Sequence, residues 1–229
     1  MNKINRALYG PSLTEVILGA TLSVALGVAL GVLHLMLTPV VTVKQIPKDA
    51  VAHAVYYIPG TRGGTSASLV DTKRKAFIAG GSVTVSEDEL NILVSSMPAA
   101  APAKPKAAAP GSKAAALATA GFFAPGAPNF RLRGGEMQVA VPVKLSAFGL
   151  EHTVHAQTRG TFVKHDESFV FDPTKLWIGA CPVDRLPGMT RFVTRKILLA
   201  RPVPTDIALA WDKLADVAIV GSSLKLTMP

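Results

Sequence analysis

The longest apolar stretch of the chain covers residues 16–37 and contains no charged side chain. At a rise of 1.5 Å per residue, a helix of this length spans about 33 Å, which matches the hydrocarbon thickness of a bilayer. A cleavable signal peptide has a shorter apolar region, followed closely by a small-x-small tripeptide. The nearest one here, Ala52-His53-Ala54, lies well beyond the stretch. We therefore expect an uncleaved signal anchor, with residues 1–41 forming an N-terminal tail and a transmembrane helix.

Small residues recur at every fourth position of this stretch: Gly19, Ser23, Gly27 and Gly31. Positions four apart line one ridge of a helix, and small side chains let two membrane helices approach closely. The ridge predicts a packing face for a second copy of the chain or for another membrane protein. The alternative interpretation is that Gly and Ser are simply frequent in membrane spans.

Residues 42–75 show neither helical nor strand periodicity, and we expect an irregular juxtamembrane segment there. The glycine-rich stretch at 60–64 lacks the Lys-Ser/Thr pair that closes a phosphate-binding loop, so it is interpreted as a turn. Residues 76–85 are predicted to be extended. Ser86 and Glu89 then form an S-x-x-E capping box at the start of a helix that carries Leu90, Leu93 and Val94.

The composition changes at residues 98–128, which contain 14 alanines and 6 prolines. Chain of this kind buries too little apolar surface to fold. We expect a disordered spacer that interrupts a domain covering residues 76–229.

Apolar residues alternate with polar ones in three later segments, as expected of half-buried strands. The apolar positions of these strands include Val139, Val141, Val143, Val154, Ala156, Phe162, Phe169, Phe171 and Ile178. Turns are predicted at 134–135 and 165–167, and a break at Asp172-Pro173. Helices are predicted at 187–200 and 205–215, and a strand at 217–228. Strands grouped apart from helices indicate an α+β fold: an N-terminal transmembrane helix, then a curved antiparallel sheet packed against helices.

No catalytic or metal centre can be assembled from these residues. His152 and His155 are three apart in a predicted strand, so they point to opposite faces and cannot share a metal. Cys181, the only cysteine, lies in an apolar strand and is expected to be a buried thiol. There is no nucleophile elbow and no carboxylate pair spaced for acid–base chemistry. We expect neither an enzyme nor a cofactor.

The predicted helix at 187–200 carries cations beside an apolar face. Phe192 and Lys196 lie within that face, and Arg191 and Arg195 lie outside it. Lys196 either reaches water past the helix edge or meets a lipid phosphate or carboxylate at the mouth of an apolar groove. Arg191 and Arg195 are candidates for contact with anionic headgroups, although a solvated charged face is the more common explanation.

The motifs at 86–91 (SEDELN), 160–162 (GTF), 169–171 (FVF) and 176–179 (LWIG), with Leu186-Pro187 before a helix, resemble small single-span bacterial envelope proteins related to tubular lipid-binding domains. The resemblance implies a curved sheet and helices around an acyl-binding groove, with no catalytic residues. Its candidate lining is Val139, Val141, Val143, Phe162, Phe169, Phe171 and Ile178, with Phe192 and Lys196. The strand residues in this set would equally pack a closed core.

The formal charge of +9 favours anionic partners, and membrane lipid is the expected one. The aromatic content of 6% is low for a stacking-type nucleic-acid binder. Lys3 and Arg6 before the span, against Lys44 and Lys48 after it, favour a cytoplasmic N-terminus and a periplasmic domain at the inner membrane. Two hypotheses result: a membrane-anchored lipid-binding protein, or a scaffold subunit assembled through its transmembrane helix.

Overall fold

The computed structural model describes residues 12–49, 51, 54–96, 123–147, 150–186, 188, 190, 193–194 and 203–229. Several predictions lie outside these residues: the tail before residue 12, most of the spacer, and nearly all of the helix at 187–200 with Arg191, Phe192, Arg195 and Lys196.

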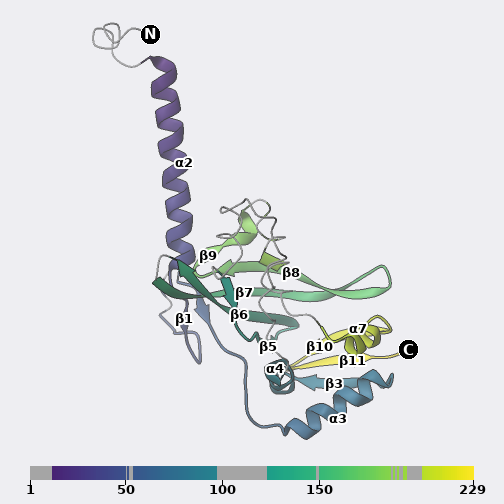
Figure 1. Cartoon of the computed structure of the whole chain (residues 1–229). Coiled ribbons are helices and arrows are strands. Elements are labelled where there is room, and N and C mark those ends of the chain that lie inside the picture. Colours follow the sequence, from purple (N-terminus) through teal and green to yellow (C-terminus); the bar gives the residue numbers. More distant parts are fainter. Residues whose placement is uncertain are drawn as a thin grey trace, which may run out of the picture.

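The apolar stretch forms one continuous helix, α2 (Leu13–Leu37), which rises away from the rest of the molecule (Figure 1). It begins three residues before the predicted start because Ser12 and Glu15 form a capping box. The Glu15 amide donates to Ser12 Oγ (3.3 Å) and the Ser12 amide donates to a Glu15 carboxylate oxygen (3.0 Å). No residue of α2 is buried. Among the described residues, α2 is the one helix long and apolar enough to cross a membrane.

A six-stranded antiparallel sheet forms the body of the domain directly below α2 (Figure 1). Three long strands dominate it: β6 (Glu136–Ala147), β7 (Leu150–His165) and β8 (Ser168–Ile178). β9 (Cys181–Pro182) pairs with β8, while β4 (Phe123–Pro125) and β5 (Asn129–Arg133) pair with different parts of β6. The predicted turns at 134–135 and 165–167 and the period-two alternation are confirmed. The predicted spacer ends too late, since β4 lies within 98–128.

The predicted break at Asp172-Pro173 is wrong, because β8 continues through it. The pairing instead skips one residue: Arg159 faces Lys175, while Gly160 faces Pro173. Thr174 is therefore bulged, and its hydroxyl donates to the Arg159 carbonyl (3.0 Å). A side chain at Gly160 would collide with the Asp172 carbonyl, so the bulge depends on this glycine.

A second, three-stranded antiparallel sheet lies on the side of the large sheet away from α2 (Figure 1). It contains β3 (Val83–Ser86), β10 (Asp216–Val220) and β11 (Ser223–Thr227). Three helices accompany it: α3 (Ala67–Ile78), α4 (Glu87–Ser96) and α7 (Thr205–Trp211). The capping box before α4 and a helix from Thr205 are confirmed.

Two predictions in this part of the chain are wrong. Residues 42–75 are not irregular throughout, and 76–85 are not all extended, because α3 spans Ala67–Ile78 and is capped by the Ser66 hydroxyl. The strand expected at 217–228 is a hairpin, since Gly221 adopts a positive φ of 62° and reverses the chain between β10 and β11.

The large sheet is covered on both faces. One face packs in the main core with the small sheet and helices, and includes Val139, Val141, Val143, Val154, Ala156 and Leu176. On the other face, Ala140 packs with Val40, Val55 and Tyr57 from the juxtamembrane segment. That segment forms two short parallel strands, β1 (Val41–Thr42) and β2 (Tyr56–Tyr57). A 3₁₀ turn (Val183–Arg185) follows β9.

A buried amide joins three separate segments of the chain. Asn91 of α4 is fully buried, and its Nδ2 donates to the carbonyls of Thr61 (3.0 Å) and Phe130 (2.8 Å). Its Oδ1 accepts from the Phe130 amide (2.7 Å) and from Asn129 Nδ2 (3.3 Å). Asn129 Oδ1 in turn accepts from the Tyr57 hydroxyl and the Gly60 amide, both at 2.7 Å. Asn91 thus makes all four hydrogen bonds open to its side chain.

Glu87 strengthens the same junction. Its carboxylate accepts from the Thr61 amide (2.6 Å) and from the Leu132 amide (2.8 Å). We call Glu87, Asn91 and Asn129 the polar clamp. It ties the juxtamembrane segment and β5 to α4. Burial also raises the pKa of Tyr57 to about 12, so its hydroxyl stays protonated as a donor to the clamp at neutral pH.

Substituting Asn91→Ala should lower the free energy of unfolding by about 3 kcal/mol or more, because it leaves several buried backbone groups without partners. Thr72→Ala on the exposed surface of α3 is the control and should change it by less than about 0.5 kcal/mol. Urea unfolding of the full chain in micelles, followed by tryptophan fluorescence, measures both. A cost below about 1 kcal/mol for Asn91→Ala would show that the clamp is dispensable.

Candidate functional site

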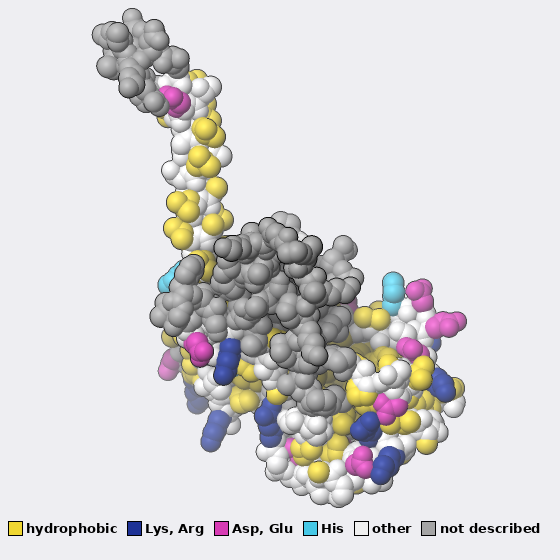
Figure 2. Space-filling view, in the orientation of Figure 1, with side chains coloured by type: hydrophobic (Ala, Val, Ile, Leu, Met, Phe, Trp, Pro, Cys, Tyr) yellow, Lys and Arg dark blue, Asp and Glu magenta, His cyan; other side chains and the backbone are white. Residues whose placement is uncertain are grey.

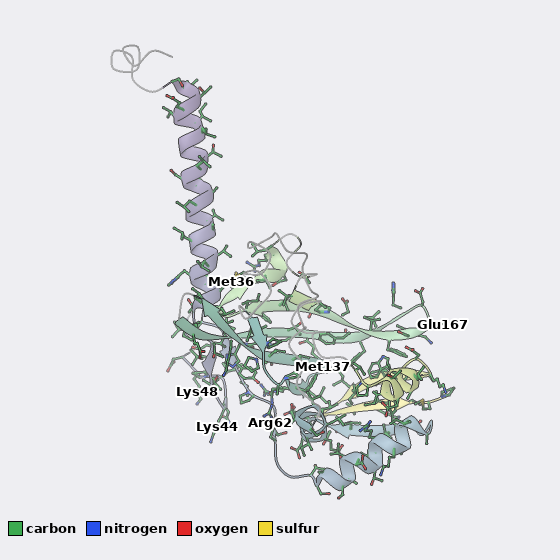
Figure 3. All side chains as sticks on the ribbon, in the orientation of Figure 1. Met36, Lys44, Lys48, Arg62, Met137 and Glu167 are labelled. Atoms are coloured by element: carbon green, nitrogen blue, oxygen red, sulfur yellow. The ribbon has the colours of Figure 1, made fainter. Side chains whose placement is uncertain are left out.

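The foot of α2 is fastened to one end of the large sheet. The Ala180 amide, in the turn between β8 and β9, donates to the Leu35 carbonyl (3.0 Å), and His152 Nε2 lies 2.9 Å from the Leu37 carbonyl oxygen. Val32 and Met36 pack on the main core, and Figure 3 shows Met36 at this junction. The contact requires Gly179, whose φ is 56° and at which a Cβ would collide with helix carbonyls.

An apolar cavity of about 160 Å³ lies between α3, α4, α7 and the small sheet. Every element around it contributes aliphatic or aromatic side chains. These are Val70, Phe77, Val83, Val85, Leu90, Leu93, Ile207, Trp211, Leu224 and Leu226. The elements that line the cavity lie at the opposite end of the domain from the foot of α2 (Figure 1). It is the described site best suited to an apolar ligand.

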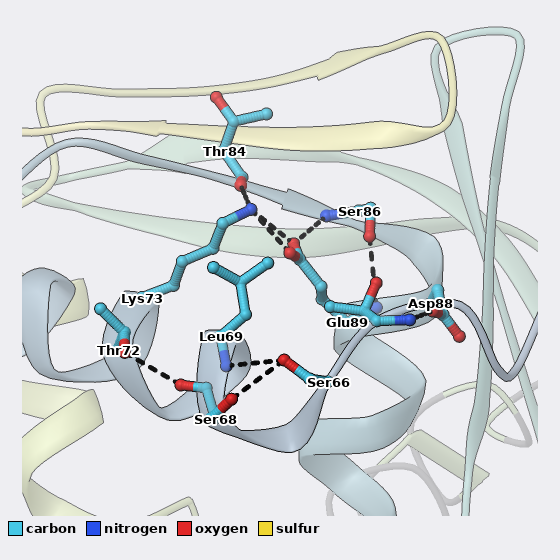
Figure 4. Close-up of polar contacts among 10 residues, drawn as sticks. Ser66, Ser68, Leu69, Thr72, Lys73, Thr84, Ser86, Asp88 and Glu89 are labelled. Atoms are coloured by element: carbon cyan, nitrogen blue, oxygen red, sulfur yellow. Dashed lines mark hydrogen bonds and ion pairs between the residues drawn. The ribbon is translucent and has the colours of Figure 1, made fainter.

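Charged side chains at the edge of the cavity are engaged with one another. Lys73 Nζ reaches from α3 to Glu89 of α4 (2.7 Å) and to the Thr84 carbonyl of β3 (2.7 Å), as Figure 4 shows. Arg74 Nη2 lies 2.9 Å from Asp206 of α7, and this hydrogen bond holds the pKa of the Asp206 carboxyl below its usual range. These pairs fix the helices around the cavity, while the Lys and Arg stems cover its wall.

The structure places the predicted groove residues in the core. Val139, Val141 and Val143 are 8%, 3% and 1% exposed. Phe162, Phe169, Phe171 and Ile178 are partly buried against the same core. None of these seven lines the apolar cavity. Two of them reach its wall through Trp211, which donates to the Phe169 carbonyl (2.7 Å) and whose ring lies 5.5 Å from that of Phe162.

Sequence reasoning missed most of the cavity lining. The sequence predicts Leu90 and Leu93 on a helix, but it gives no sign that they line a binding site. Val70 and Phe77 are seven apart on α3 and both buried, which is a helical repeat that could have revealed this helix. The contributions of β3, α7 and β11 come together only through the tertiary fold.

The predicted ridge on α2 is uncovered. No part of the described chain lies within 4 Å of a Cβ placed at Gly19, Gly27 or Gly31, and Ser23 is exposed. The ridge is therefore available to another helix, and the large apolar side chains around it are exposed as well, including Leu22, Leu26 and Leu30.

The residues considered for chemistry do not converge. His152 is exposed, whereas His155 is half-buried beside the Tyr57 ring at 5.6 Å. Cys181 is buried, and burial raises the pKa of its thiol. No group of three metal-ligating side chains occurs among the described residues. In the glycine-rich loop, the Gly63 and Thr65 amides donate to Asp88 (2.5 and 2.9 Å), so these donors are not open to a phosphate.

No protein-family model matches this chain, and neither does any curated protein or solved structure. What the site binds is therefore inferred from its own chemistry.

Proposed function

We propose that this chain is a non-enzymatic protein, anchored by α2 in a bacterial inner membrane, that binds an acyl chain or similar lipid-like ligand in the apolar cavity. The observation that carries the proposal is the cavity itself: about 160 Å³ lined by apolar side chains from α3, α4, α7 and the small sheet. Because every one of these elements contributes apolar side chains, the cavity favours an apolar guest.

The position of the cavity suggests what binding would achieve. The elements that line it lie at the opposite end of the domain from the foot of α2 (Figure 1), so an acyl chain bound there would be held outside the bilayer while the protein stays attached to it. The charge bias around the span, with Lys3 and Arg6 before it against Lys44 and Lys48 after it, favours a periplasmic domain. The protein would thus shield a lipid-like ligand near the membrane surface.

A photoactivatable fatty acid tests the proposal on the full chain in nanodiscs. We expect crosslinks to peptides of α3, α4 and α7, located by mass spectrometry. Val85→Phe should reduce these crosslinks at least tenfold, because the larger ring fills the cavity from β3. Val163→Phe is the matched control, since Val163 is 48% exposed and lies away from the cavity, and it should leave labelling unchanged.

Melting temperatures of the two variants separate a blocked cavity from a damaged fold. Crosslinks confined to α2, or equal labelling of the cavity in Val85→Phe and the wild type, would rule out acyl binding at this site.

The second candidate function is a scaffold subunit assembled through α2, and the uncovered small-residue ridge favours it. A ridge of this type allows close backbone packing between two membrane helices. The two functions are compatible, because the ridge and the cavity lie on different parts of the chain.

Gly27→Leu with Gly31→Leu should abolish any complex held together by the ridge, because the added side chains keep the helices apart. Ala25→Leu with Ala29→Leu is the control: it adds bulk on the opposite side of the helix at 100° per residue. Chemical crosslinking in the membrane measures how much of the complex each double variant forms. A complex that survives the glycine changes, or is lost equally with the alanine changes, would count against the scaffold.

A further inference from the structure

A row of cationic residues crosses the large sheet on the face opposite the main core. In the register of the sheet, Arg131 of β5 faces Gln138 of β6, which faces Arg159 of β7, which faces Lys175 of β8. Side chains at such aligned positions lie on one face. Leu132 points the other way, into the main core, so Arg133 joins Arg131 on the cationic face.

The three arginines line a pocket of about 270 Å³. Its other lining residues are Gln138, Glu136 and two isoleucines of the juxtamembrane segment, Ile46 and Ile58. An adjoining hollow brings Lys44 next to Arg131 and Arg133. Figure 2 shows several Lys and Arg side chains at the lower left of the domain, where Figure 3 labels Lys44 of the adjoining hollow together with Lys48 and Arg62.

No salt bridge engages the three arginines within the described residues, although Glu136 lies directly across from Arg133 in the sheet register. Arg159 lies 5.7 Å from the centre of the Trp177 ring, a contact that leaves its hydrogen-bond donors available. Glu87 is nearby, but its oxygens already accept from Thr61 and Leu132. Glu136 is the one acidic residue lining the pocket.

The crowding of like charges acts on Arg131. Partial burial lowers the pKa of Arg131, the neighbouring charges of Arg133 and Arg159 lower it further, and Glu87 offsets part of this effect. Because arginine stays protonated in proteins, the three guanidinium groups remain positively charged and repel one another. Uncompensated like charges around a pocket are the arrangement expected where an anion supplies the missing charge.

We propose that this pocket binds a phosphate-type oxyanion, held by the guanidinium groups of Arg131, Arg133 and Arg159. Guanidinium groups present planar pairs of N–H donors that match phosphate oxygens, and Gln138 adds a neutral hydrogen-bonding group. Ile46 and Ile58 offer apolar contact to whatever carries the phosphate. The chemistry suits a free phosphate and a phospholipid headgroup alike. The site is separate from the apolar cavity and does not depend on acyl binding there.

The test uses the full chain in nanodiscs of zwitterionic lipid and measures its melting temperature. Inorganic phosphate should raise it more than sodium chloride of equal ionic strength does. The double variant Arg131→Gln with Arg159→Gln should lose this difference, with apparent affinity falling about tenfold or more. Lys213→Gln with Lys225→Gln, two exposed cations outside the pocket, removes the same charge and should keep the response. Arg133→Gln alone, at an exposed position, should weaken it partially even if the double variant folds poorly.

A second set of nanodiscs containing anionic phospholipid identifies the source of the phosphate. Stabilisation by anionic nanodiscs but not by free phosphate, lost in the arginine variants only, would assign the site to a headgroup. A response to free phosphate alone would assign it to a soluble ligand. Equal responses in the arginine and lysine double variants, or no response to either phosphate source, would overturn the proposal. Val85→Phe should leave every response intact.

Discussion

The fold is organised around a helix that the described part of the chain leaves unburied along its whole length. α2 contains 25 residues and none of them is buried, so its apolar surface needs either a bilayer or a partner helix. Within the described residues, the foot of the helix is the part that touches the domain, through the Leu35 carbonyl, Met36 and the turn at Gly179. Because the contacts at Leu35 and Gly179 involve backbone atoms at short distances, they fix the direction of the helix relative to the large sheet. In the proposed arrangement, one edge of the sheet lies at the membrane surface and the apolar cavity faces away from it.

The polar clamp extends this link to the cavity. Asn91 lies on α4 within one helical turn of the cavity-lining residues Leu90 and Leu93. The helix that lines the cavity is therefore also the helix that holds the juxtamembrane segment. Tyr57 and Gly60 reach the clamp through Asn129, and Arg131, two residues along β5, lines the cationic pocket. The two proposed binding sites therefore adjoin the same buried junction, although they lie on different faces of the large sheet and are proposed to bind independently.

The sequence was most informative where a single local pattern decides the structure. The apolar stretch predicted α2, strict alternation predicted β6 and β7, and the Ser86/Glu89 capping box predicted the start of α4. Prediction from the sequence failed where tertiary contacts determine the structure. In α3 the buried apolar residues are Val70 and Phe77, a seven-residue repeat that is the one local sign of this helix, and β4 lies in Ala/Pro-rich sequence. The residues predicted to line a groove came from the strands with the clearest alternation, and these residues lie in the core. The cavity is instead lined by five elements that meet only in the folded chain. Arg131 and Arg159 were not singled out, because their alignment depends on the strand register.

The most direct test of the central claim, that α2 crosses a membrane and holds the whole domain on one side, is cysteine accessibility in intact cells. Cys181 is the only cysteine and is buried, so Cys181→Ser provides a background free of thiols. Single cysteines are then introduced at Asn5, before the helix, and at Asp166, in the exposed turn between β7 and β8. The account predicts that a membrane-impermeant maleimide labels Asp166→Cys in intact cells, and labels Asn5→Cys only after the membrane is permeabilised. Labelling of both positions from the same side would contradict it.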